Sequence, residues 1–353
     1  MTDVEVMVVG AGQAGLSAAY FLAGRGFAPH REFVVLDANA AAGGAWQHRW
    51  RSLRLRDVHG LYPLPGVETI ADGDDEDEAR DVVARAFARY ERRFGLPVVR
   101  PVIVGSVREA DDASDRLLVD TERGTWRARA LINATGTWTR PFWPTYPGAD
   151  RFGGRQLHTA DYDGPDGFAG QHVVVVGGGH SAVQHLAELA EVTTTTWVTR
   201  RPPAWRDTPF DEAAGRAAVT RVEEAVAAGR RPSSVVSVTG LAVTPAVEAA
   251  RERGVLERLP IFDRLTHDGV AWDDGRHVRA DVVLWATGFR HAIDHLAPLG
   301  LRDAAGGVRM AGTQVAADPR IHLLGYGPSA STIGANRAAR TAVRDLRRFL
   351  GRR

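Results

Sequence analysis

Two glycine-rich runs hold the residues of this sequence that are best suited to chemistry. The first is Gly10-Ala-Gly-Gln-Ala-Gly15, and the second is Gly177-Gly-Gly-His-Ser-Ala182. Glycines at this spacing let the backbone turn tightly and approach a pyrophosphate, and the helix that starts there offers unpaired N–H groups to the phosphates. Two such runs predict two bound dinucleotides, and hence two redox cofactors that exchange electrons.

The residues that end the next strand differ between the two runs. After the first run, an apolar strand over 33–36 ends at Asp37, whose carboxylate suits the ribose hydroxyls of an unphosphorylated adenosine. After the second run, a strand over 195–199 ends in Arg200 and Arg201, whose guanidinium groups suit a 2′-phosphate. The alternative reading of these arginines is a solvated pair at a strand end. We expect NADPH rather than NADH at the second site.

A second pair of glycines favours FAD as the first cofactor. The segment Gly43-Gly-Ala-Trp46 follows Asp37 closely, and its glycines would let a loop lie over the rest of a long dinucleotide. The residues expected to bind the two cofactors lie in the glycine runs, the strand ends, this loop, the stretch 50–55 that follows it, two Ala-Thr-Gly turns and the start of the last helix. They are Gly10, Gly12, Gln13, Ala14, Gly15, Asp37, Gly44, Ala45, Trp46, Arg54, Ala134, Thr135, Gly136, Gly177, Gly179, His180, Ser181, Ala182, Arg200, Arg201, Thr287, Gly288, Ser331, Thr332 and Ile333.

The elements that must position these residues alternate between strands and helices. A continuous apolar run at 6–9 and the segment 172–176, His172 followed by four valines, predict buried parallel strands, and each is followed by a helix with one apolar face. The tripeptide Ala-Thr-Gly ends an apolar strand twice, at 134–136 and 286–288, and the two copies bracket the second glycine run. The predicted fold class is therefore α/β with two Rossmann-like domains, the NADPH domain being inserted into the FAD domain.

The predicted domain limits follow from these turns. Residues 1–150 form the first part of the FAD-binding domain, and residues 287–353 form its second part. Residues 151–286 form the inserted NADPH-binding domain, with an alanine-rich helical cap at about 209–257 beside the substrate entrance.

Three further segments complete the expected organisation. Residues 98–132 predict a small β-meander, and the acidic run 72–78 lacks the glycine and spacing of a calcium loop, so that a solvated turn is expected there. The final helix, 335–350, is expected to aim its N-terminus at the isoalloxazine ring, where the helix dipole stabilises negative charge on the reduced flavin.

Three stretches carry a family resemblance: Gly-Gly-Ala-Trp at 43–46, the stretch 50–55 followed by 64–66, and the segment 152–162. They resemble the flavin-containing monooxygenases and the related Baeyer-Villiger monooxygenases of the class B flavin monooxygenase superfamily. The third stretch matches the family pattern Phe-x-Gly-x-x-x-His followed by an aromatic residue, with Tyr162 where Baeyer-Villiger members have tryptophan.

The resemblance implies three candidate catalytic residues, His158, Asp57 and Arg56. It gives His158 a role in linker geometry and in positioning the nicotinamide cofactor, and the alternative reading is a packed hinge histidine without chemistry. Arg56, Asp57 and His59 stand where many flavin-containing monooxygenases have an asparagine that supports the flavin oxygen adduct. This departure leaves the reaction type and the substrate open.

The activity implied by the resemblance is an NADPH-dependent monooxygenation. A flavin C4a-(hydro)peroxide would transfer one oxygen atom from dioxygen to a small organic substrate, by N- or S-oxygenation or by Baeyer-Villiger chemistry. One alternative is a cysteine-free NADPH-dependent flavoprotein reductase that passes electrons to a ferredoxin, a flavodoxin or another acceptor. A non-catalytic NADPH sensor is the third reading.

Composition excludes several other classes of protein. The 353 residues carry 44 basic and 43 acidic side chains, so no overall field recruits nucleic acid or a membrane surface. Every basic residue other than histidine is arginine, and there is no cysteine, which excludes a P-loop lysine, a thiolate metal site and a redox-active cysteine pair. The chain enters its first strand at once and has no apolar run of the roughly 18 residues that a membrane span needs, so we expect a cytoplasmic protein without a signal segment. No bound metal is expected. A homodimer is left open.

Overall fold

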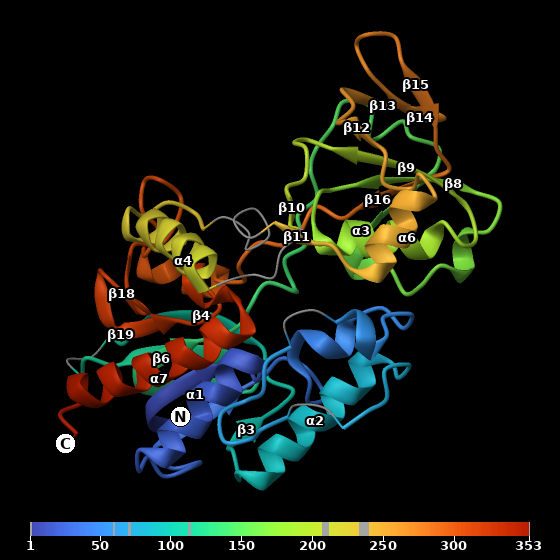
Figure 1. Ribbon diagram of the computed structural model, residues 1–353. Coiled ribbons are helices and arrows are strands. Elements are labelled where there is room, and N and C mark those ends of the chain that lie inside the picture. Colours follow the sequence, from blue (N-terminus) through green and yellow to red (C-terminus); the bar gives the residue numbers. More distant parts are fainter. Residues whose placement is uncertain are drawn as a thin grey trace.

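The structure is a computed structural model that describes residues 2–58, 61–69, 72–111, 114–206, 212–232 and 240–352. Two α/β units are visible in Figure 1, each built around its own parallel sheet. The chain passes from the first unit to the second after β6 (Gly124–Asn133) and returns after β16 (Val282–Trp285).

Five parallel strands form the centre of the first sheet. They are buried because their apolar residues are covered on both faces, as expected for parallel strands. The antiparallel strands β4 (Val104–Glu109) and β5 (Leu117–Thr121) continue into β6, which confirms the predicted meander. The parallel strands follow the order β3 (Val98–Val99), β2 (Phe33–Leu36), β1 (Thr2–Val9), β6 and β19 (Asp318–Leu323), and β17 (Met310–Ala311) and β18 (Gln314–Val315) extend the sheet beyond β19.

Helices cover one face of this sheet. Helices α1 (Gln13–Gly24), α2 (Ala79–Arg93) and α7 (Thr332–Phe349) share one buried core with β1 and β6. The opposite face packs against the meander and the short helix η5 (Asp294–Leu299). The two faces leave the carboxyl ends of the parallel strands as the edge where the glycine runs lie.

The second sheet is wholly parallel. Helix α3 (His180–Leu189) packs on one of its faces, and a small antiparallel sheet packs on the other. The five strands follow the order β12 (Arg258–Pro260), β9 (Thr194–Thr199), β8 (His172–Val176), β16 and β7 (Arg155–His158), and the small sheet contains β13 (Arg264–Thr266), β14 (Gly269–Ala271) and β15 (His277–Arg279).

The insertion expected from the sequence is present. All strands of the second sheet lie between β7 and β16 in the chain, whereas β19 returns to pair with β6 in the first sheet. This confirms the predicted fold class of two Rossmann-like units, one inserted into the other. The proposed limits at residues 150 and 286 stay predictions.

The expected helical cap at about 209–257 is not one body. Helix α4 (Glu212–Ala227) packs against the first unit, where Val226 joins the core that contains Ile321 (Figure 1). Helix α6 (Pro245–Glu252) packs instead against α3 of the second unit. The two helices separate because their apolar faces meet different units. Residues 207–211 and 233–239 of this region lie outside the described residues.

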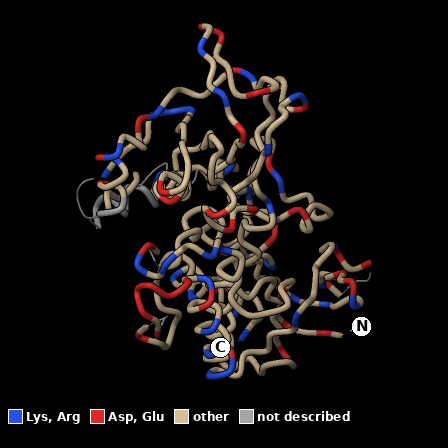
Figure 2. The backbone as a smooth tube through the Cα atoms, turned by 90° about the vertical axis from the view of Figure 1, so that its right-hand side faces the viewer, with Lys and Arg blue, Asp and Glu red and all other residues tan. Residues whose placement is uncertain are grey.

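The strand β10 (Trp205–Arg206), which precedes α4 in the chain, pairs with β11 (Leu241–Ala242), which follows it. Basic and acidic residues occur throughout both units, and neither unit carries only one sign of charge (Figure 2). Within the described residues, no helix has the length and apolarity needed to cross a membrane, and no group of His, Asp or Glu side chains could hold a metal ion.

Candidate dinucleotide and active site

The first glycine run forms a tight turn between β1 and α1. Gly10 has a φ of 99°, and a Cβ there would lie 2.5 Å from the Ala134 carbonyl oxygen, so only glycine fits. A Cβ on Gly15 would lie 1.8 Å from the Gly10 carbonyl oxygen, because helix and turn are in direct contact. Gly12 caps α1 without a side-chain hydrogen bond, which leaves the N–H groups of the first helical turn available to a ligand.

The second run repeats this geometry in the inserted unit. Gly177 has a φ of 148°, and its Cβ would lie 2.2 Å from the Ala286 carbonyl oxygen. Gly179 caps α3 without a side-chain hydrogen bond. Each Ala-Thr-Gly turn therefore closes against the first glycine of its own unit, and Ala134 and Ala286 donate equivalent 2.8 Å hydrogen bonds to Val9 and Val176.

The glycines that face outward leave room for a bound dinucleotide. A Cβ on Gly179 would meet no atom within 4 Å, and one on Gly12 would meet only the Cα of Gly44, at 3.9 Å. Open space therefore lies over the two capping glycines, while Gly10 and Gly177 are closed by packing. This is the arrangement that a pyrophosphate above a helix N-terminus requires.

The other predicted residues of the two runs have different environments. Ala14 and Ala182 are buried in α1 and α3, so only their backbone N–H groups could reach a ligand. The Gln13 side chain donates a 2.9 Å hydrogen bond to Asn336 of α7, and His180 and Ser181 occupy the first turn of α3. Gln13 thus ties the first glycine run to the last helix.

Asp37 is held in place at the carboxyl end of β2. Its side chain is buried, and Oδ1 accepts hydrogen bonds from the Asn39 backbone N–H (3.1 Å) and side-chain amide (3.0 Å). Arg100, which also forms a bidentate pair with Glu91, lies 3.4 Å from Oδ2. The sequence reasoning missed Arg100, because only the sheet brings residue 100 beside residue 37.

The loop after Asp37 covers the first glycine run. The Cα of Gly12 would lie 2.7 Å from a Cβ on Gly44, which begins the short helix η1 (Gly44–His48) with Ala45 and Trp46. This close approach explains why glycine is needed at position 44. Farther along, Arg54 donates a 3.2 Å hydrogen bond to the Glu76 carbonyl.

Two arginines follow β9, as predicted. Arg200 and Arg201 are exposed, and neither has an ion-pair partner among the described residues. A third arginine was missed: Arg258 of β12 donates to the Thr199 hydroxyl at 3.0 Å and its carbonyl at 3.2 Å. Parallel pairing of β12 with β9 brings Arg258 to this strand end.

The threonines of the two Ala-Thr-Gly turns bind across the linkers. Thr135 donates a 2.6 Å hydrogen bond to the Ala292 carbonyl of the returning linker, and Thr287 donates to the Phe142 carbonyl of the outgoing linker. Gly288 accepts a 2.9 Å hydrogen bond from the Phe142 N–H. These hydroxyls, expected to contact a nucleotide, clamp the two linkers together.

His158 belongs to the same clamp. The side chain is fully buried at the end of β7, where Nδ1 accepts from the Ala160 N–H at 3.1 Å and Nε2 donates to the Gly288 carbonyl at 3.0 Å. Burial lowers the pKa of His158, although the Gly288 hydrogen bond opposes that shift. Both ring nitrogens are occupied by backbone, so the geometry favours the reading of a hinge histidine.

Arg56 and Asp57 lie in the short helix η2 (Leu55–Asp57) beside the inserted unit. Both side chains are partly exposed, and Arg56 forms an ion pair with Glu76. The Asp57 carbonyl accepts a 2.9 Å hydrogen bond from Gln184 of α3. The fold brings Arg56 and Asp57 to the junction of the two units, and His59 lies outside the described residues.

A carboxylate missed by sequence reasoning joins the units at this junction. Glu188 of α3 accepts hydrogen bonds from Trp50 Nε1 (3.0 Å), the Ser52 hydroxyl (2.7 Å) and the Tyr162 hydroxyl (2.9 Å). Burial raises the pKa of Glu188, and these three donors oppose that shift. Trp50 and Ser52 belong to the first unit, so Glu188 anchors the inserted unit to it.

The start of α7 has the form expected of it. Ser331 caps the helix by accepting a 3.1 Å hydrogen bond from the Gly334 N–H, and Thr332 and Ile333 form the first turn. Asn336 donates a 2.7 Å hydrogen bond to the Pro63 carbonyl and accepts from Gln13. The helix N-terminus is therefore fixed beside the first glycine run.

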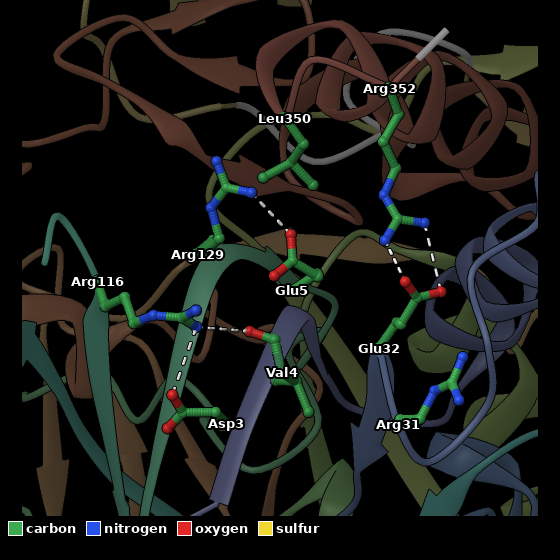
Figure 3. A pocket seen from close by; sticks show the side chains of 9 residues that line it. All are labelled: Asp3, Val4, Glu5, Arg31, Glu32, Arg116, Arg129, Leu350 and Arg352. Atoms are coloured by element: carbon green, nitrogen blue, oxygen red, sulfur yellow. Dashed lines mark hydrogen bonds and ion pairs between the residues drawn. The ribbon is translucent and has the colours of Figure 1, made fainter.

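A cavity of about 440 Å³ lies elsewhere, at the amino ends of the strands (Figure 3). Its charges are largely paired: Arg129 with Glu5 at 2.8 Å, and Arg352 with Glu32. Dinucleotides bind at the carboxyl ends of parallel strands, so this cavity is not part of the candidate site.

The fold and the two glycine turns define the class: flavoproteins with two dinucleotide-binding units. The family described as pyridine nucleotide-disulphide oxidoreductase matches residues 7–233. A flavin-containing monooxygenase from Stenotrophomonas maltophilia has 39% identity over 99% of this chain and 100% of its own, with a TM-score of 0.84. The chain belongs to the flavin monooxygenases of this family, and it is an oxidoreductase.

Other relatives are more distant or longer. An uncharacterised oxidoreductase CzcO from Bacillus velezensis is 29% identical over 57% of this chain and 56% of its own length. A Baeyer-Villiger monooxygenase from Streptomyces coelicolor is 32% identical over 57% of this chain and 38% of its own. The matches thus span about half or less of these curated relatives. A steroid monooxygenase bound to NADP, with a TM-score of 0.66 and 20% identity, shares the fold.

Proposed function

We propose that the protein is an FAD- and NADPH-dependent monooxygenase that transfers one oxygen atom from dioxygen to a small organic substrate. The proposal rests on two equivalent glycine turns, one in each unit, and on the hydrogen bonds that hold the two linkers between the units together. Two nucleotides held at these turns would meet at the junction of the units, where electrons could pass between them. The partners proposed are the substrate and dioxygen, in the cytoplasm, and a homodimer is left open.

The residues present fit both cofactors. Gly12, Gly44 and Asp37 would hold FAD, and Gly179 with the first turn of α3 would hold the pyrophosphate of NADPH. Arg200 and Arg201 favour NADPH because they are charged, exposed and without acidic partners among the described residues. When bound, the two cofactors would supply hydride transfer and the activation of dioxygen.

The protein's own contribution is to position the cofactors and to exclude water. His158, Thr135 and Thr287 hold the linkers in one arrangement through hydrogen bonds to backbone carbonyls. Glu188 fixes the inserted unit against Trp50 and Ser52, which follow the loop that covers the first glycine run. Oxygenation requires that water be kept away from the reacting oxygen atoms. These contacts would help by holding the junction in one arrangement.

Stopped-flow oxidation of the NADPH-reduced protein tests this function. We expect rapid loss of the oxidised flavin absorbance on adding NADPH, and then, on mixing with dioxygen, a transient near-ultraviolet band before oxidised flavin returns. Immediate return of oxidised flavin, with only hydrogen peroxide as product, would support a reductase and contradict oxygenation. No flavin reduction by NADPH would support a sensor instead.

A further inference from the structure

Arg49 is a half-buried charged side chain for which no carboxylate of the described residues serves as a counter-ion. It ends η1, and its guanidinium carbon lies 5.5 Å from the ring centroid of Trp46 and 5.0 Å from that of Trp138. Its Nε is buried and has no hydrogen-bond partner, and no carboxylate of the described residues forms an ion pair with it. Burial lowers the pKa of Arg49 to about 10, so the group stays charged at neutral pH.

Two other arginines with little exposed surface, Arg100 and Arg320, are neutralised. Arg100 pairs with Glu91 at 2.6 Å, and Arg320 pairs with Asp318 at 2.7 Å. A cation removed from water is costly unless it has an anionic partner, and contacts with aromatic faces compensate only part of that cost. The lack of a partner at Arg49 therefore suggests that an anion binds there.

The surroundings place that anion at the junction of the two units. Trp138 follows the first Ala-Thr-Gly turn, and it stacks on Phe289 of the returning linker with ring centroids 4.9 Å apart. On the other side, the charge of Arg49 contributes to lowering the pKa of His185 in α3, after the larger effect of burial. The next residue, Trp50, lies 4.6 Å from His185 of α3, ring centroid to ring centroid, so that Arg49 is near both the linkers and the second unit.

The anions of the cofactors already have binding groups under the proposed function. The two pyrophosphates have the turns capped by Gly12 and Gly179, the 2′-phosphate has Arg200 and Arg201, and the reduced flavin has the N-terminus of α7. Arg49 is a cation near the junction that these groups do not use. Its guanidinium can hold a carboxylate through two parallel hydrogen bonds.

We infer that Arg49 binds a carboxylate of the substrate, so that the substrate class is an organic acid. The inference rests on the proposed function. The aromatic side chains of Trp46, Trp138 and Phe289 suit an acid whose remaining part is apolar. Arg49 selects the substrate by charge, and it orients the acid between the two cofactors.

Calorimetric titration of the protein loaded with FAD and NADP⁺ tests this role. The probes are acetate, benzoate and phenylacetate, with benzamide as a neutral control. We expect at least one carboxylate to bind the wild type, and Arg49→Gln to weaken it at least tenfold without changing the binding of benzamide. Arg49→Lys should restore part of the affinity because it restores the charge.

Arg51→Gln is the matched control. Arg51 is exposed and pairs with Asp163 at 3.1 Å, so its replacement should leave carboxylate binding unchanged. Equal flavin content and thermal midpoints would show that the variants are folded, and if Arg49→Gln fails to fold, the comparison of Arg49→Lys with wild type decides. Absence of carboxylate binding to the wild type, or unchanged binding in Arg49→Gln, would overturn the inference.

Titrations of FAD and NADP⁺ separate the possible sources of the anion. If Arg49→Gln weakens a cofactor tenfold while carboxylate binding is unchanged, the anion is a cofactor phosphate and the inference is wrong. Failure of the proposed function is distinguishable, because it is judged from flavin reoxidation in the wild type without any carboxylate.

Discussion

At the scale of single residues, opposite charges at equivalent strand ends distinguish the two nucleotide sites. Asp37 is buried at the end of β2 and is held by Asn39 and Arg100, whereas Arg200 and Arg201 are exposed after β9. A carboxylate would repel a 2′-phosphate, and guanidinium groups would attract it. Arg258, which bonds to Thr199, stiffens the same strand end.

Replacement of Arg200 tests the choice of nicotinamide cofactor. Arg200→Ala should raise the KM for NADPH about tenfold and leave that for NADH nearly unchanged, because only NADPH carries the 2′-phosphate that a charged hydrogen bond would bind. Steady-state flavin reduction with each cofactor measures the effect. Arg264→Ala, an exposed arginine on the hairpin of the second unit, is the control. Equal changes for the two cofactors would rule out the assignment.

At the scale of elements, each strand-turn-helix unit is completed by a turn from a distant part of the chain. Ala134 closes the β1 turn and Ala286 closes the β8 turn, each against a glycine with positive φ. The glycine that caps each helix, Gly12 in α1 and Gly179 in α3, has open space beside it. Packing therefore explains one glycine of each run, and ligand access explains another.

Two alanine substitutions in one turn separate these roles. Gly177→Ala should destabilise the protein by about 1–3 kcal/mol, because the added Cβ collides with the Ala286 carbonyl at a strained φ. Gly179→Ala should keep the thermal midpoint and weaken NADPH binding, since its Cβ enters the open space above α3. Thermal unfolding and NADP⁺ titration measure the two effects. If Gly179→Ala bound NADP⁺ as tightly as wild type, the open space would not be the phosphate site.

At the scale of the whole molecule, the two units are held together by reciprocal contacts. Thr135 and Thr287 each bond to the opposite linker, His158 bonds to Gly288, and Glu188 receives three donors. These contacts join segments that are far apart in sequence. The linkers therefore help to hold the two units in one arrangement.

Histidines whose pKa is lowered in the folded protein make the stability of the whole molecule sensitive to acid. Burial lowers the pKa of His291, His295 and His322 from 6.5 to about 4. Below pH 6.5 these histidines bind protons in the unfolded chain but stay neutral in the folded protein. The free energy of unfolding should therefore fall as the pH drops from 6.5 towards 4. Each histidine contributes up to about 1.4 kcal/mol per pH unit in this range.

Urea unfolding at several pH values measures this slope. His322→Gln should reduce the slope, whereas His277→Gln, at an exposed position of β15, should leave it close to that of wild type. A slope in His322→Gln equal to that of wild type would contradict the assignment of His322 to this effect.

The two glycine turns, the charges that follow each second strand, the meander and the inserted topology could all be predicted from the sequence. These features could be predicted because they depend on residues that are close in the chain, on apolar strand patterns and on the conformational freedom of glycine. The repeated Ala-Thr-Gly tripeptide added the one long-range relation that the sequence shows directly.

The roles that depend on distant partners became clear only from the folded protein. The fold brought backbone partners to both nitrogens of His158 and directed the hydroxyls of Thr135 and Thr287 to the linkers. It also divided the expected cap between two units, and it placed Arg49 where no carboxylate of the described residues pairs with it. Glu188 and Arg258 carry no local signal at all. The physical reason is that burial and pairing are set by which surfaces meet after folding, and residue type alone does not specify that partner.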